Sequence, residues 1–348
     1  MNAGQKTIEW LRNEQLRVDE EWSVDTPNGF TWWAAKNAQS IEIAGSEVGP
    51  DGDIGYFVRI KTEMWRNVEL TDQSMAGVNL LMSTASMAGP VWDEDRETIS
   101  FSSMVRVHEG IWEWMARWIS IAAMVQIQDA HFLGSQFAPV LGGEPAESAH
   151  PANGIRDEPD ELVVGFAPML ATAGEQRSKW AAREFQQAVD QYMQQPPSLM
   201  ASGGGRGLTV EFPFGDFSSL CQFQGDRPHP RIGNGLLIIQ KFPVGEMLEL
   251  DGIQLALELN AEELDKKPIC YGLGSYCYQD GCVCFNGFIP NLAYQPGMLP
   301  NLYFACAGRA QAMSARLTDN DWSQGFAPTK TPKAKSALRR LMDRFSGE

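Results

Sequence analysis

Four of the six cysteines in this 348-residue chain lie within sixteen residues, from Cys270 to Phe285. The stretch reads CYGLGSYCYQDGCVCF. Its Asp-Gly pair is typical of a two-residue type I′ turn, which places Cys277 opposite Cys284 on a β-hairpin. Thiols at such positions pack as small apolar groups, form a reversible disulfide or bind zinc.

The spacing favours some of these roles over others. The pattern C-x₄-C-x-C has no second C-x₂-C, so a tetrahedral zinc site requires a fourth ligand from elsewhere. Directly opposed residues of a hydrogen-bonded pair have Cα atoms about 5.5 Å apart, a distance that a disulfide spans. We therefore take Cys277 and Cys284 as a candidate redox pair, with simple packing as the plainer interpretation. We predict no metal site and no cofactor.

No other residues form a recognisable catalytic set. The histidines lie outside any Ser/His/Asp or Cys/His arrangement, and the numerous carboxylates are typical of a solvated surface. We therefore predict no catalytic residue. The four histidines are His108, His131, His150 and His229.

The tryptophans are the better candidates for a binding surface. Trp32 and Trp33 are adjacent on a predicted strand, so one of them faces away from the core. Trp112, Trp114 and Trp118 crowd another segment. They either fill the core and the contact between two halves, or form an apolar surface that accepts a partner chain.

The chain repeats one order of elements, α-β-β-β-α-β-β-α. Each half is predicted to open with a helix, continue with two aromatic-rich strands and a third strand rich in β-forming residues, then a helix, a β-hairpin and a last helix. In the first half we expect two strands around a turn at 29–45, a third strand at 55–64 and the hairpin 104–114. In the second half we expect two strands at 207–225, a third at 235–244 and the hairpin 276–285. The expected helices begin near Thr7, Met75, Ser120, Glu175, Ile253 and Leu299.

This repeat bears on the cysteines. His108-Glu109-Gly110 lies about 171 positions before Gln279-Asp280-Gly281. That offset matches Cys277 and Cys284 with Arg106 and Glu113, so we expect the thiols on a solvent-touching face. A fold that carries an ion pair in one copy needs no metal in the other.

The order predicts an α+β fold of two tandem repeats with antiparallel sheets. We expect the halves to pack sheet to sheet as an intrachain pseudo-dimer. The predicted segments are a first repeat at 1–135, a Pro/Gly/Ala-rich linker at 136–174, a second repeat at 175–320 and a basic tail at 321–348.

This acidic α-β-β-β-α-β-β-α unit resembles the type III secretion chaperone fold and its YbjN-like and TY-Chap relatives. The resemblance covers about 270 residues in two copies and rests on element order and acidity. It implies a non-catalytic fold that holds a partner polypeptide in extended form. It implies no catalytic residue.

The composition limits the classes of partner that we expect this chain to bind. The net charge is −16, which repels phosphate backbones, so we expect no nucleic-acid partner. Neither a leader segment nor a stretch of 18 apolar residues is visible, and we expect a cytoplasmic protein without a transmembrane segment.

The C-terminal segment 321–348 is basic and carries apolar residues at spacings of three and four. Leu338, Leu341 and Phe345 would share one helical face. We predict a short amphipathic helix for a protein partner or for peripheral contact with an anionic membrane.

The sequence thus predicts a chaperone or adaptor that holds a protein or peptide partner on its sheet faces or strand edges. The alternative is a small-molecule or redox sensor, or an enzyme, that uses the Cys270–Cys284 hairpin.

Overall fold

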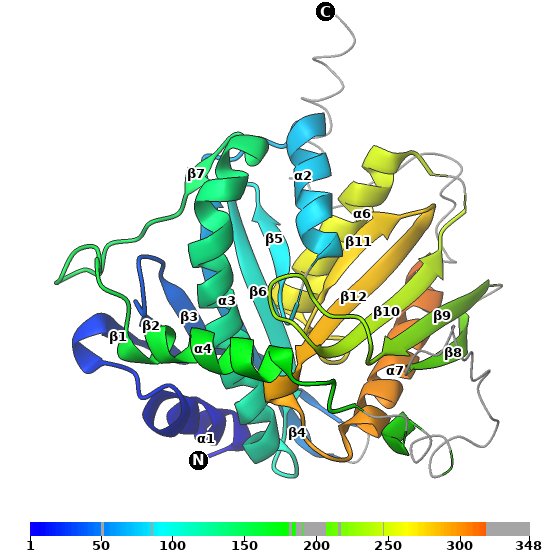
Figure 1. Ribbon diagram of the computed structural model, residues 1–348, viewed down its shortest axis with the longest axis horizontal. Coiled ribbons are helices and arrows are strands. Elements are labelled where there is room, and N and C mark those ends of the chain that lie inside the picture. Colours follow the sequence, from blue (N-terminus) through cyan, green and yellow to red (C-terminus); the bar gives the residue numbers. More distant parts are fainter. Residues whose placement is uncertain are drawn as a thin grey trace, which may run out of the picture.

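The computed structural model describes residues 1–49, 52–84, 86–180, 183–185, 190, 207–214, 217–245 and 247–317. It confirms an α+β fold with two antiparallel sheets (Figure 1). The first sheet has the strand order β1-β2-β3-β4-β6-β5, and the short β7 pairs with β4. The second has the order β11-β12-β10-β9-β8. Leaving out β1 and β7, both sheets are therefore connected in the same order.

In the first part of the chain, the elements are α1 (Ala3–Trp10), η1 (Leu11–Gln15), η2 (Glu20–Trp22), β1 (Ser23–Thr26), β2 (Gly29–Trp32), β3 (Gln39–Val48), β4 (Ile54–Arg66), α2 (Asp72–Ser83), β5 (Gly89–Asp93), β6 (Thr98–Val107), α3 (Trp112–Leu141) and β7 (Glu144–Pro145). The later elements are α4 (Glu161–Glu175), β8 (Gly207–Phe214), β9 (Phe217–Gln224), β10 (Gly235–Pro243), α6 (Glu249–Ala261), η3 (Glu262–Lys266), β11 (Ser275–Gln279), β12 (Cys282–Pro290), η4 (Asn291–Ala293) and α7 (Met298–Leu317).

The prediction of a hairpin at 104–114 is wrong. Residues 104–107 end β6, and α3 begins at Trp112, so Ser120 lies inside a helix rather than at its start. The apolar residues of this segment recur at helical spacing through Met115, Ile119 and Ala122, all buried. Helical periodicity therefore outweighs the strand preference of its aromatic residues.

The real first-half hairpin joins β5 to β6 through residues 94–97. Val91 faces Ser100 in it, at the same distance from the turn as Cys277 faces Cys284. Arg106 and Glu113 are thus not the matching positions, because one lies in β6 and the other in the first turn of α3.

The segment expected as a linker, 136–174, carries regular structure. It holds the end of α3, then β7 and α4. Asp160 caps α4 by accepting a hydrogen bond from Leu162 N–H at 2.8 Å, and the buried Phe166 anchors this Pro- and Gly-containing helix. The helix expected from Glu175 lies mostly outside the described residues, as does the segment 321–348.

The halves meet mainly through helices and edge strands, not through sheet faces as expected. Helix α2 packs on β11 and α6 packs on β5, while α2 and α6 also contact each other (Figure 1). Within the described residues, two backbone contacts cross between the halves. Met104 exchanges both of its hydrogen bonds with Gly272, at 3.2 and 2.9 Å, and Phe288 N–H donates to the carbonyl of Ser86 at 2.9 Å. Met104 and Phe288 occupy the same place in β6 and β12, counted from the turns.

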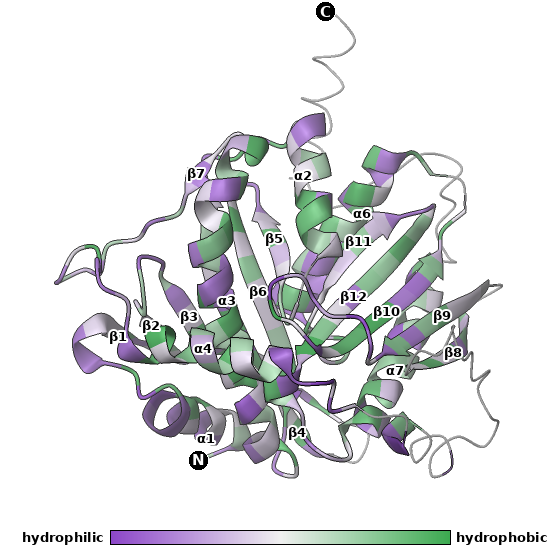
Figure 2. Ribbon diagram, viewed as in Figure 1, coloured by the Kyte–Doolittle hydropathy of each residue, from purple (hydrophilic) through white to green (hydrophobic). Residues whose placement is uncertain are grey.

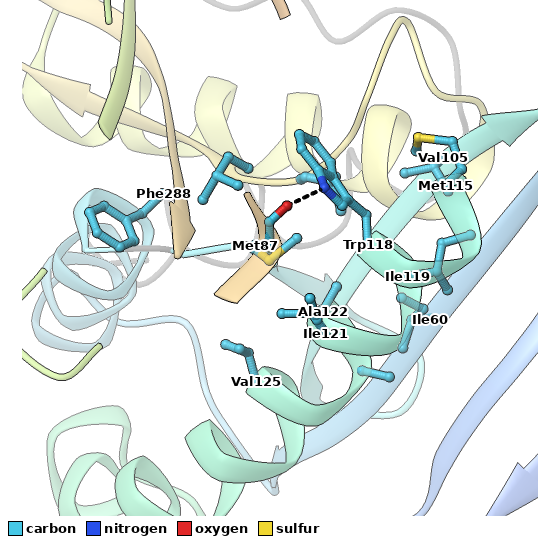
Figure 3. Close-up of a cluster of buried hydrophobic side chains, with 14 of the residues drawn as sticks. Ile60, Met87, Val105, Met115, Trp118, Ile119, Ile121, Ala122, Val125 and Phe288 are labelled. Carbon is cyan, nitrogen blue, oxygen red and sulfur yellow. Dashed lines mark hydrogen bonds between the residues drawn. The ribbon is translucent and has the colours of Figure 1, made fainter. Parts of the chain in front are cut away.

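The buried apolar side chains of the described residues form two clusters, and each draws on both sheets. Figure 2 shows green, hydrophobic colour along much of β10 and β12 and purple, hydrophilic colour on α1. In Figure 3, Trp118 lies among the side chains of α3. Its indole N–H donates a hydrogen bond to the carbonyl oxygen of Ala293 at 2.8 Å. The halves thus share their core.

Of the helices in the described part of the chain, none is both long and apolar enough to span a bilayer.

Candidate functional site

A groove of about 500 Å³ lies between α1 and the first sheet. Helix α1 and its N-cap form one wall, with Asn2, Gln5 and Glu9, and the turn between β1 and β2 forms another. Ile43, Ala44, Gly45 and Ser46 of β3 form its floor, together with Tyr56 of β4. This is a concave site built from several elements, as binding sites usually are.

Local sequence fixes α1 in this position. Asn2 and Gln5 form a capping box, in which each side chain accepts a hydrogen bond from the other residue's N–H, at 2.9 and 3.1 Å. Gly4 lets the helix approach the sheet closely, because a Cβ atom there would lie 2.9 Å from Tyr56 Cβ and 3.0 Å from Ile43 Cδ1. A larger residue at position 4 would push α1 away and open the groove.

The floor of the groove is an unpaired strand edge. Strand β2 pairs with β3 only from Gln39 to Glu42, whereas β4 accompanies β3 to Val48. Ile43 N–H still donates to Asn28 C=O in the turn between β1 and β2, at 2.9 Å, but over 44–48 no strand of the described residues lies on the outer side of β3. A β-bulge between Ile43 and Gly45 leaves Ala44 without a partner and bends the strand there.

The register shows which backbone groups of β3 face its free edge. Gly49 N–H donates to Asp53 C=O, so the antiparallel alternation makes Val48–Ile54 and Ser46–Tyr56 non-hydrogen-bonded pairs. The N–H and C=O groups of Ser46 and Val48 therefore point away from β4, toward the free edge. Among the described residues, no backbone group accepts from or donates to them there. Such an edge can accept an added strand.

The predicted tryptophans mostly do not form a surface. Trp32 and Trp118 are fully buried and Trp33 is 6% exposed, which leaves them no area for a partner. Trp112 and Trp114 are half-buried and pack at the rim of the core. Leu338, Leu341 and Phe345 lie outside the described residues.

Trp33 follows the end of β2 and belongs to neither core cluster, and another segment covers it. His150, from the loop between β7 and α4, places its ring 4.8 Å from that of Trp33, edge-on. Sequence spacing could not reveal this contact, because it joins residues more than a hundred positions apart.

The cysteine hairpin has the predicted register and the predicted turn. Cys277 faces Cys284, and Asp280 and Gly281 both have positive φ, 53° and 73°, as a type I′ turn requires. Both thiols are buried, which corrects the expected solvent-touching face. All six cysteines are free thiols. The hydrogen bond that the Cys277 thiol donates to Cys284 and burial raise the pKa of Cys277, so this thiol stays protonated and a poor nucleophile.

A buried ion pair lies near this hairpin. Arg309 of α7 donates to Glu263 of η3 at 2.7 and 3.2 Å, and Tyr276 O–H donates to the same carboxylate at 2.5 Å. Burial alone would lower the pKa of Arg309, but the Glu263 carboxylate holds it well above its usual value. The guanidinium also lies 3.6 Å from the ring centre of Phe285. All these groups are enclosed, so the network fixes α7 on the sheet rather than facing a substrate.

Within the described residues, no group of three or more His, Cys, Asp or Glu side chains is placed to bind a metal ion.

The groove residues were missed by sequence reasoning, although one signal was present. Gly45 interrupts a strand pattern, and an isolated glycine of that kind indicates a bulge or a close approach. The comparison of this chain with protein-family models, with curated proteins and with solved structures finds no match in any of the three.

Proposed function

We propose that this chain is a non-catalytic protein-binding module, a chaperone or adaptor, that holds an extended segment of a partner polypeptide. The observation that carries the proposal is the unpaired edge of β3 over 44–48, which begins inside a groove walled by α1. An added strand would satisfy the outward N–H and C=O groups of Ser46 and Val48. The groove wall would then contact alternate side chains of the partner.

The proposal extends to how the chain is built. We infer two copies of one α-β-β-β-α-β-β-α unit, related as a pseudo-dimer within the chain. The shared strand order supports this, as do the matching crossing contacts at Met104 and Phe288. The same order underlies the resemblance to secretion chaperones, whose role is to hold a polypeptide. We expect a polypeptide rather than a nucleic acid because the net charge is −16, and we expect a cytoplasmic setting.

Strand addition is tested with a display library of ten-residue peptides screened on the purified full chain. Peptides selected in this way should slow hydrogen exchange at the amides of Ser46 and Val48. Ser46→Pro should weaken binding about tenfold or more, since it removes one outward donor, with little effect on folding because that N–H makes no ladder bond to β4. Gly45 before it tolerates the proline.

Asp25→Pro is the matched control. It removes an outward donor from the free edge of β1 and loses only an exposed ion pair with Arg12. It should leave peptide affinity unchanged. Selected peptides that protect amides elsewhere, or that bind Ser46→Pro as well as the unaltered chain, would exclude the β3 edge as the site.

The second candidate function is redox sensing by Cys277 and Cys284. Their register on β11 and β12 and the hydrogen bond between their thiols favour it. Hydrogen peroxide would take two hydrogen atoms from the pair and form one S–S bond and water. Mass spectrometry of the peroxide-treated folded chain tests this: a disulfide that joins Cys277 to Cys284 supports sensing, and its absence at the peroxide level that oxidises a free thiol control rules it out.

A further inference from the structure

A second cavity, of about 230 Å³, adjoins the groove at α1. Met1 and Glu9 line both hollows, so a chain that lies in the groove passes the mouth of this cavity. The other residues that line it are Lys6, Trp10, Asn13, Glu14 and Trp112.

Two indole rings form the apolar part of the cavity. Trp10 and Trp112 stand edge to face, with ring centres 6.3 Å apart. Both are half-buried and therefore present part of their ring surface to the cavity. The π-face of tryptophan is the strongest aromatic acceptor for a cation.

Two carboxylates complete the lining of this cavity. Glu9 and Glu14 are exposed, and neither forms a salt bridge within the described residues. The cation of the cavity, Lys6, is already held by Glu109 at 2.7 Å. Negative charge without a counter-charge therefore lies beside aromatic surface.

We propose that this cavity binds an arginine side chain of the partner segment. The inference rests on the proposed function, because the segment itself is the one held on β3. A guanidinium group stacks on tryptophan and bonds to carboxylates through its planar fork, so it fits this combination better than an ammonium group. The strongly negative chain favours a basic segment at longer range as well.

The test compares two eight-residue peptides, acetylated and amidated, of alternating valine and arginine or alternating valine and citrulline. Citrulline keeps the size and planarity of arginine without its charge. We expect the arginine peptide to bind at least about tenfold more tightly to the full chain. The double variant Glu9→Gln, Glu14→Gln should remove most of that preference. The matched variant Glu20→Gln, Glu21→Gln, at exposed acids of η2, should keep it.

Each outcome decides a different point. If both peptides bind equally and protect the amides of Ser46 and Val48, strand addition stands and the arginine site is overturned. A preference for arginine that survives Glu9→Gln, Glu14→Gln would reflect the overall charge and would overturn this cavity as its source. If neither peptide binds, the proposed function fails and the arginine site fails with it.

Discussion

Two strand edges of this molecule contrast sharply, the outer edge of β11 and the outer edge of β3. On β11, Asn79 donates to Tyr278 C=O and accepts from its N–H, at 2.8 and 2.9 Å. Asn260 does the same for Tyr276, at 3.0 and 2.7 Å. On β3 over 44–48, no such side chain or strand of the described residues covers the edge.

The difference shows that the fold prevents a further strand from pairing with β11 and permits one to pair with β3. The amides on β11 come from α2 and α6, one helix from each half, so closing this edge also joins the halves. An uncovered strand edge invites aggregation, and folded proteins therefore close, bend or shorten their edges. The edge of β3 is short and bent by a bulge, and α1 stands beside it. It is thus restricted to segments that fit the groove, not open to any strand.

The largest loss of stability is expected when the closed outer edge of β11 is opened at its buried end. Asn260→Ala leaves the N–H of Tyr276 without a partner at a fully buried site, and the C=O of Tyr276 keeps only the hydroxyl of Ser275. We expect a loss of about 3–5 kcal/mol in the free energy of unfolding, from the lost hydrogen bonds of Asn260 and the cavity together. Urea denaturation measures it. Asn79→Ala, which is half-buried, should cost less, about 1–3 kcal/mol. Equal small losses below about 1 kcal/mol would show that the amides do not hold the edge.

A second effect concerns α2, the helix that carries Asn79. His229 Nδ1 accepts from Arg231 N–H at 3.2 Å, so its Nε2 carries the proton and donates to Thr84 C=O at 3.0 Å, where α2 ends. Burial lowers the pKa of His229 to about 4. The unfolded chain, with its His pKa near 6.5, therefore binds a proton first as the pH falls.

The stabilisation that neutral His229 contributes to the folded state is therefore fully present above about pH 6.5, and it is lost as the pH falls toward 4. The loss is about 3 kcal/mol at most, since one pKa unit corresponds to about 1.4 kcal/mol. His229→Asn should flatten the pH dependence of unfolding in this window, and His131→Asn, at an exposed position, should not. If the pH dependence of unfolding in this range is the same in the His229→Asn variant, other groups cause the acid sensitivity.

Periodicity was enough to predict most elements, since α2, α6, α7 and the β11–β12 hairpin stand where apolar spacing and turn residues indicate them. The β5–β6 hairpin was missed because its turn, residues 94–97, contains no glycine, while the turn at His108-Glu109-Gly110 leads into α3 and not into a second strand. Which edge is open could not be predicted, because it depends on where β2 stops beside β3. Burial of Trp33 depends on a distant loop in the same way.

The smallest effect is expected where the halves differ only in side chains. Val91 facing Ser100 occupies the position of Cys277 facing Cys284, and all four are buried. The double variant Cys277→Val, Cys284→Ser should therefore change the free energy of unfolding by less than about 1 kcal/mol, since total volume is nearly kept. It gives up a weak bond from the Asn286 amide to the Cys277 sulfur, at 3.2 Å. Calorimetry under reducing conditions measures the change, and Cys277→Ala alone, which leaves a void, should cost more. A loss of several kcal/mol in the double variant would mean that the second half needs its thiols for packing in a way that the first half does not.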